Sequence, residues 1–187
     1  HLSSRRQRQM CNRDSVNLEP TNVEPMQEAV DALQEADLIV LGPGSLYTSV
    51  ISNLCIEGIS KAIISSQAPK LYISNIMTQP GETNGYDVYD HIEAIHQHAG
   101  KPFIDYVICS NDEFDEQILK WYKERNAHPV STNETKLTKN HIKIITSKNL
   151  VEVYDKVLVR HNTKVLAKLV YDLALELTST IQFKPKK

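Results

Sequence analysis

The pattern of apolar and polar positions along the chain alternates between helical periods and short continuous apolar runs. The continuous runs are typical of strands buried on both faces, and they occupy residues 38–41, 71–75 and 106–109. Helical periods occupy residues 25–36, 48–54, 59–66, 87–99, 114–125 and 165–177. Because parallel strands need crossover helices, this order predicts an α/β fold with a mostly parallel sheet covered on both sides.

Apolar faces and end signals define the individual helices. The first predicted helix has one apolar face, made of Met26, Ala29, Val30 and Leu33. Asp87 can cap the helix whose apolar face carries Val88, Ile92, Ile95 and Ala99. The least regular segment is 128–150, where we expect only short strands near Val130 and at residues 142–146, followed by another at 151–153.

Composition and charge exclude several classes of protein. The 187 residues are 41% hydrophobic and 24% charged, which is ordinary for one globular domain. The formal net charge of -2 gives no global attraction to nucleic acid or to an anionic membrane. No apolar run approaches the roughly 18 residues that a membrane span needs. The polar, basic start has no apolar core typical of a secretory signal. We therefore expect a cytoplasmic protein.

The same features predict the domain boundaries. Residues 1–15 have no clear period, and we expect a disordered or non-family lead-in there. Residues 16–183 form the α/β domain, and residues 184–187 form a basic tail. Three cysteines lie far apart, with no spacing for a zinc site or a redox pair. The histidines of the segment 87–99 have no i, i+4 pair, so we expect no metal site and mostly exposed side chains at His91, His96 and His98.

The first candidate ligand segment follows the first predicted strand and opens a helix. Ligands of open parallel sheets bind beyond the carboxyl ends of the strands. Gly42 and Gly44 allow close backbone approach, a helix start favours phosphate, and Ser45 and Thr48 add hydroxyl donors. The alternative is a tight strand-to-helix turn with a Ser/Thr cap. Ser45 has no partner base that the sequence identifies, and we predict no catalytic residues.

Two further polar segments occupy comparable places. Asn75, Thr78 and Gln79 follow the second strand and can hydrogen-bond a base, a ribose or a sugar, although an ordinary surface loop is the alternative. Glu82 could act as a general base, but spacing places no second carboxylate or histidine with it. Arg160 precedes the last helix and can hold a phosphate through two parallel N–H bonds, with Asn162 or Thr163 as helix cap. The alternative there is a capping box with incidental charges.

Four motifs resemble those of one bacterial protein family. These are Leu-Glu-Pro at 18–20, Gly-Pro-Gly-Ser-Leu-Tyr-Thr-Ser-Val-Ile at 42–51, Met-Thr-Gln-Pro-Gly-Glu-Thr at 77–83, and Arg-His-Asn-Thr-Lys-Val-Leu at 160–166. In these motifs the chain resembles the YvcK-type gluconeogenesis factors, which share a wider, CofD-like family with 2-phospho-L-lactate transferase. The resemblance covers about residues 16–183.

The resemblance implies a Rossmann-like three-layer sandwich and a regulatory protein without catalysis. The implied ligand is a UDP-sugar such as UDP-N-acetylglucosamine, with a dinucleotide as an alternative, and no further cofactor is required. The implied role links gluconeogenic carbon metabolism to cell-wall precursor supply and cell shape. A cell-wall precursor enzyme or another regulatory protein is the implied partner, and a homo-oligomer stays open.

The resemblance also assigns residues to the ligand site. Gly44, Ser45 and Thr48 would lie at the nucleotide phosphates. Arg160 would contact the diphosphate or the uridine, and Tyr122 stands where the family carries an aromatic ligand contact. The full set of expected ligand residues is Gly42, Gly44, Ser45, Tyr47, Thr48, Asn75, Thr78, Gln79, Tyr122, Arg160, His161 and Lys164.

One departure from the family qualifies this expectation. Family members begin with a strand and a Gly-Gly-Gly-Thr-Gly loop, which this sequence does not contain. We therefore expect the chain to match the C-terminal part of the family fold and to bind nucleotide weakly if half of the site is lacking. The alternative function is a phosphotransferase of the 2-phospho-L-lactate transferase type, which would need a carboxylate or a metal near residues 42–45. Spacing indicates no such group.

Overall fold

The centre of the molecule is a four-stranded parallel sheet. We describe it from a computed structural model that covers residues 15–20 and 23–182, so the expected lead-in, apart from Ser15, and the basic tail lie outside the described part. The strand order is β1–β2–β3–β4, and every neighbouring pair is parallel. The strands are β1 (Ile39–Leu41), β2 (Lys70–Ile73), β3 (Tyr106–Ser110) and β4 (Lys143–Ser147).

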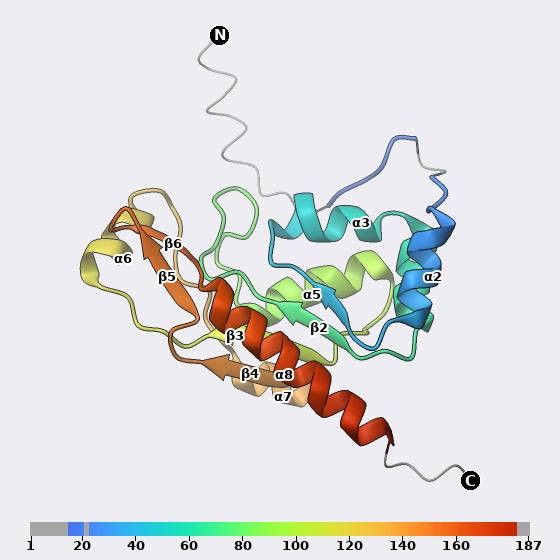
Figure 1. Cartoon of the computed structure of the whole chain (residues 1–187). Helices are drawn as coiled ribbons and strands as arrows, with labels where there is room; N and C mark the ends of the chain where they lie inside the picture. Colours follow the sequence, from blue (N-terminus) through green and yellow to red (C-terminus); the bar gives the residue numbers. More distant parts are fainter. Residues whose placement is uncertain (1–14, 21–22, 183–187) are drawn as a thin grey trace.

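Helices cover both faces of this sheet, which confirms the predicted α/β layers (Figure 1). One face packs against η1 (Leu46–Ile51), α3 (Ser52–Leu54), α4 (Glu57–Ser65), α5 (Val88–Ala99) and α7 (Glu134–Lys139). The other packs against the long helix α8 (Thr163–Gln182). Alternate side chains of β2 point to opposite faces of the sheet. Tyr72 packs on the face covered by η1, α3, α4, α5 and α7, and Leu71 and Ile73 pack on the face covered by α8.

A smaller unit sits at the carboxyl ends of the strands. The antiparallel hairpin of β5 (Val151–Tyr154) and β6 (Leu158–His161) packs against α6 (Glu116–Lys123) there (Figure 1). Its buried contacts join Val159 to Ile118 and Tyr122. This third cluster of apolar side chains is separate from the two cores of the sheet, and it places the hairpin beside the loops that follow β1 and β2.

Local end signals are confirmed where they were predicted. The Asp87 side chain accepts the N–H of Asp90, and the Asp90 side chain accepts the N–H of Asp87, so the two form a capping box at the start of α5. The Asn162 side chain accepts the N–H groups of Lys164 and Val165 at the start of α8. Both caps stabilise their helices through contacts within three residues of sequence, which is why the pattern alone indicates them.

Several predicted details are wrong. Val40 is 39% exposed, because β1 lies at the edge of the sheet in the described part of the chain. The helix α2 (Gln27–Glu35) was predicted, and its Leu33 packs against the core, but Met26 and Ala29 of the predicted apolar face are exposed. Near Val130 there is only an isolated bridge between Met77 and Pro129. The helix α7 and the strand β6 were not predicted at all.

The expectation of exposed histidines on α5 is also wrong. His91 and His96 are buried, and His98 is half-buried, because this side of the helix faces the sheet and η1. Nδ1 of His91 lies 2.8 Å from the carbonyl oxygen of Asp87, and Nε2 of His96 accepts the N–H of Ile104 at 3.2 Å. Burial lowers the pKa of both side chains, so the neutral form is favoured.

None of the helices in residues 23–182 has both the length and the apolarity to cross a membrane.

Candidate functional site

A cavity of about 560 Å³ lies at the carboxyl rim of the sheet and brings the three predicted segments together. Residues 43–45, 75–80 and 159–161 supply three of its walls, although more than 100 positions separate the first from the last. The segment from α6 to Ala127 supplies the fourth. The lining residues that had been predicted are Gly44, Ser45, Asn75, Thr78, Gln79, Tyr122, Arg160 and His161.

Two glycines shape the loop after β1. Gly42 has φ +87°, and a Cβ there would lie 3.0 Å from the carbonyl oxygen of Ile73. The close approach is therefore to the neighbouring strand, and Gly42 does not line the cavity. At Gly44 a Cβ would lie 3.0 Å from the Cβ of Ser49, which keeps the turn into η1 tight while Gly44 itself lines the cavity.

One wall of the cavity is cationic and aromatic. The guanidinium of Arg125 lies 3.8 Å from the centre of the Trp121 ring and donates to the Trp121 carbonyl at 2.9 Å. Arg160 donates one N–H to the Val159 carbonyl at 2.9 Å. None of the ion pairs within residues 15–20 and 23–182 involves either arginine. Their charges are therefore available to an anionic ligand.

Tyr122 holds the hairpin that carries Arg160. Its side chain is 9% exposed, and its hydroxyl oxygen accepts the backbone N–H of Val159 at 3.0 Å. The Tyr122 ring also packs edge-on against Trp121, with ring centres 4.9 Å apart. The predicted aromatic ligand contact is thus a lining residue whose hydroxyl is already engaged in placing β6.

Two residues of the lining, Ser45 and Gln79, lie beside a carboxylate that is not itself part of the lining. The Ser45 hydroxyl lies 2.7 Å from Oε2 of Glu82 and 2.9 Å from Oε1 of Gln79. The sequence identified no carboxylate near residues 42–45 and no partner for Ser45 or Glu82, and the structure brings these two side chains together. Spacing could not reveal the contact, because Ser45 and Glu82 are 37 positions apart and follow different strands.

His161 forms part of the same rim. Its Nε2 lies 3.2 Å from the carbonyl oxygen of Ser74, which links β6 to the end of β2. Burial lowers the pKa of His161, and the hydrogen bond to the Ser74 carbonyl offsets part of that effect. At neutral pH the positive charge of the cavity therefore comes from the arginines.

Three further predicted residues lie outside the cavity lining. Tyr47 is 1% exposed, and its hydroxyl lies 2.9 Å from that of Tyr86, so it belongs to the core. Thr48 and Lys164 have exposed side chains away from the lining. At the start of α8 the N–H groups of Lys164 and Val165 donate to Asn162, so these two donors are not free for an anion.

Sequence reasoning missed Trp121 and Arg125, which line the cavity. They stand at i and i+4, the spacing that brings helical side chains together, so an aromatic residue followed by arginine at that distance could have indicated them. Their place beside residues 42–45 could not be read from the sequence, because it depends on how α6 packs on the hairpin.

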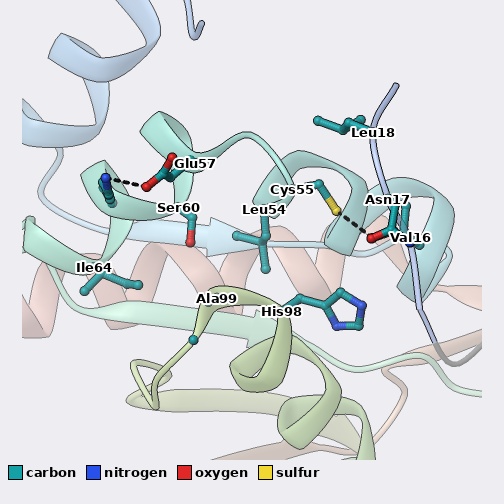
Figure 2. Close-up of a pocket in the computed structure, with 12 residues that line it drawn as sticks. Val16, Asn17, Leu18, Leu54, Cys55, Glu57, Ser60, Ile64, His98 and Ala99 are labelled. Carbon is teal, nitrogen blue, oxygen red and sulfur yellow. Dashed lines mark hydrogen bonds and ion pairs between the residues drawn. The ribbon is translucent and has the colours of Figure 1, made fainter. Parts of the chain in front are cut away.

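A second cavity of about 500 Å³ lies at the C-terminal end of α5. Its lining includes residues 16–18, the α3–α4 segment and the end of α5, and Figure 2 shows Cys55 pointing to the Val16 carbonyl across it. No predicted ligand residue lines this cavity, and among the described residues no arginine does. The described residues hold no group of three or more His, Cys, Asp or Glu side chains that could bind a metal ion.

Comparisons with known proteins agree on one family. The family described as CofD, 2-phospho-L-lactate transferase, matches residues 2–150. A gluconeogenesis factor from Bacillus subtilis (strain 168) is 38% identical over 161 residues, which are 86% of this chain and 50% of the relative. A gluconeogenesis factor from Listeria monocytogenes is 49% identical over 104 residues, which are 56% of this chain and 32% of the relative.

Solved structures show the same relationship. A crystal structure of a UPF0052 family member from Bacillus halodurans superposes with a TM-score of 0.77 at 38% identity, covering 82% of this chain and 49% of that one. A second crystal structure from the same organism gives a TM-score of 0.78. The matched part of the chain spans 50% and 51% of two of these relatives and 36% of a putative gluconeogenesis factor from Clostridium acetobutylicum.

Proposed function

The chain belongs to the CofD family, and its relatives there include proteins named gluconeogenesis factor; from this we propose that it binds a sugar nucleotide of the UDP-N-acetylglucosamine type. The observation that carries the proposal is the cavity in which residues 43–45 and Arg160 share one rim beside Arg125. Two guanidinium groups without carboxylate partners among the described residues favour a diphosphate. The cavity volume of about 560 Å³ suits a small organic ligand.

The proposed role is regulatory. The relatives' name supports a function in gluconeogenic carbon metabolism. We extend this to control of cell-wall precursor supply and cell shape in the cytoplasm, with the sugar nucleotide as the signal and another protein as the receiver. Because the chain spans about half of these relatives, this role is proposed for the protein to which the matched portion corresponds.

Titration calorimetry with millimolar UDP-N-acetylglucosamine tests the binding. Arg160→Ala should weaken binding about 10- to 100-fold, since hydrogen bonds to a charged group contribute about 1.5–3 kcal/mol. Lys148→Ala is the matched control, because Lys148 is exposed, carries the same charge and lies outside the cavity lining. Equal affinity of the wild type and the Arg160 variant would count against a diphosphate at this wall.

A second candidate function rests on the contact between Ser45 and Glu82. A carboxylate 2.7 Å from a hydroxyl is an arrangement that a transferase can use to move a proton. The alternative is a phosphotransferase that moves a phospho-organic acid from a nucleoside diphosphate donor. Release of nucleotide above a control without protein, abolished by Glu82→Gln, would favour this alternative over a regulatory protein.

A further inference from the structure

The cavity lining has two chemically different parts. The arginines and Trp121 form one part, which we call the arginine end, and the loops after β1 and β2 form another. In the second part the Ser45 hydroxyl has one proton and two acceptors, Glu82 Oε2 at 2.7 Å and Gln79 Oε1 at 2.9 Å. We call these three residues the acceptor end.

The proton balance at the acceptor end leaves Gln79 Oε1 with weak donors only. A carboxylate is a stronger acceptor than an amide, so the shorter contact to Glu82 holds the Ser45 proton. The other contact of Gln79 Oε1 is a 3.4 Å approach from the side-chain amide of Asn75, which is long for a hydrogen bond. Ser45 and Gln79 both line the cavity, whereas Glu82 does not, so a ligand in the cavity meets the side chains of Ser45 and Gln79.

The loop holds these acceptors in place without a ligand. The Gln79 N–H donates to Oγ1 of Thr83 at 2.8 Å, and Thr83 is fully buried. The backbone N–H groups of Glu82 and Thr83 both donate to the Gln79 carbonyl, at 3.0 and 2.9 Å. A site that is already ordered loses less conformational entropy on binding.

Phosphate suits this end poorly and a sugar suits it well. Phosphate oxygens only accept hydrogen bonds and carry negative charge, so the Glu82 carboxylate repels them. Sugar hydroxyls and an acetamido N–H donate hydrogen bonds, which Gln79 Oε1 and the Ser45 oxygen can accept. We propose that the acceptor end binds the sugar of the nucleotide through these donors, while the arginine end holds the diphosphate. This inference rests on the proposed function and assigns Ser45 to the sugar rather than to the phosphates.

Calorimetry with UDP and with UDP-N-acetylglucosamine separates the two ends. We expect Gln79→Ala and Glu82→Gln each to lower the preference for the sugar nucleotide over UDP about 3- to 30-fold. The affinity for UDP should stay within about threefold, or rise slightly in Glu82→Gln as the negative charge is removed. Glu113→Gln, at an exposed loop position outside the cavity lining, is the matched control for the second variant.

The outcomes distinguish this inference from the function on which it rests. If both variants weaken UDP and the sugar nucleotide equally, the acceptor end does not bind the sugar, although the proposed function stands as long as Arg160→Ala weakens both ligands. If the wild type binds neither ligand at millimolar concentration, both proposals are wrong. Release of UDP from the sugar nucleotide that depends on Glu82 would overturn the inference in favour of a proton-transfer role. Thermal melts of each variant establish that it is folded.

Discussion

Tyr122→Phe tests whether the hairpin that carries Arg160 is held by one buried hydroxyl. The substitution keeps the ring and removes the acceptor of the Val159 N–H, which lies 3.0 Å away. Both residues are at least nine-tenths buried, so water cannot easily replace the lost partner. An unsatisfied buried donor costs about 1–3 kcal/mol.

This cost of about 1–3 kcal/mol predicts two measurable changes. For a chain of this size, 1 kcal/mol shifts the melting temperature by about 2–4 °C, so the expected decrease is about 2–12 °C. The affinity for UDP-N-acetylglucosamine should fall as well, because Arg160 follows Val159 directly in β6. Differential scanning fluorimetry measures the first change, and calorimetry measures the second.

The exposed tyrosine of α8, Tyr171, provides the matched control. Tyr171→Phe makes the same chemical change on α8 at a side chain that is 63% exposed, and it should leave the melting temperature within about 1 °C. A Tyr122→Phe variant as stable as the wild type would refute the reasoning on the buried N–H. A less stable variant with unchanged affinity would show that the hairpin keeps Arg160 in place without this hydrogen bond.

Two further predictions concern stability. Urea unfolding should give a constant free energy of unfolding above about pH 6.5 and a lower one as the pH falls below it. Burial lowers the pKa of His91 and His96, whereas the unfolded chain binds protons near the ordinary value of 6.5. His91→Gln should reduce this pH dependence, and an unchanged slope in that variant would contradict the assignment to His91. Gly42→Ala should destabilise the protein by about 1–3 kcal/mol, and by more than Gly85→Ala, since both glycines have positive φ but only Gly42 has a neighbour within 4 Å of the added Cβ. Equal chemical-denaturation midpoints for these two variants would show that contact with the Ile73 carbonyl does not destabilise a side chain at position 42.

Much of the candidate site follows from the sequence because a parallel sheet brings the carboxyl ends of its strands to one edge. Residues 42–45 and 75–79 follow β1 and β2, which are neighbours in the sheet. Their convergence at the cavity confirms the argument from topology. Arg160 joins them for a different reason, since it lies on β6, a strand that the local pattern did not predict. Whether these residues bind a sugar nucleotide stays a prediction.

The sequence by itself determined the features that depend on neighbours within a turn or two. The periods of α5 and α8, the continuous apolar run of β3, and the caps at Asp87 and Asn162 all depend on short spacings, and the structure has each of them. Local spacing carries this information because hydrogen bonds within helices and at their ends join residues three or four positions apart.

Only the tertiary structure decided which distant side chains meet. Ser45 contacts Glu82 and Tyr122 contacts Val159, in each case across 37 positions. The exposure of Val40 depends on where β1 lies in the sheet, and the burial of His91 depends on which side of α5 faces the core. Such contacts result from the packing of whole elements, and no periodicity along the chain encodes them.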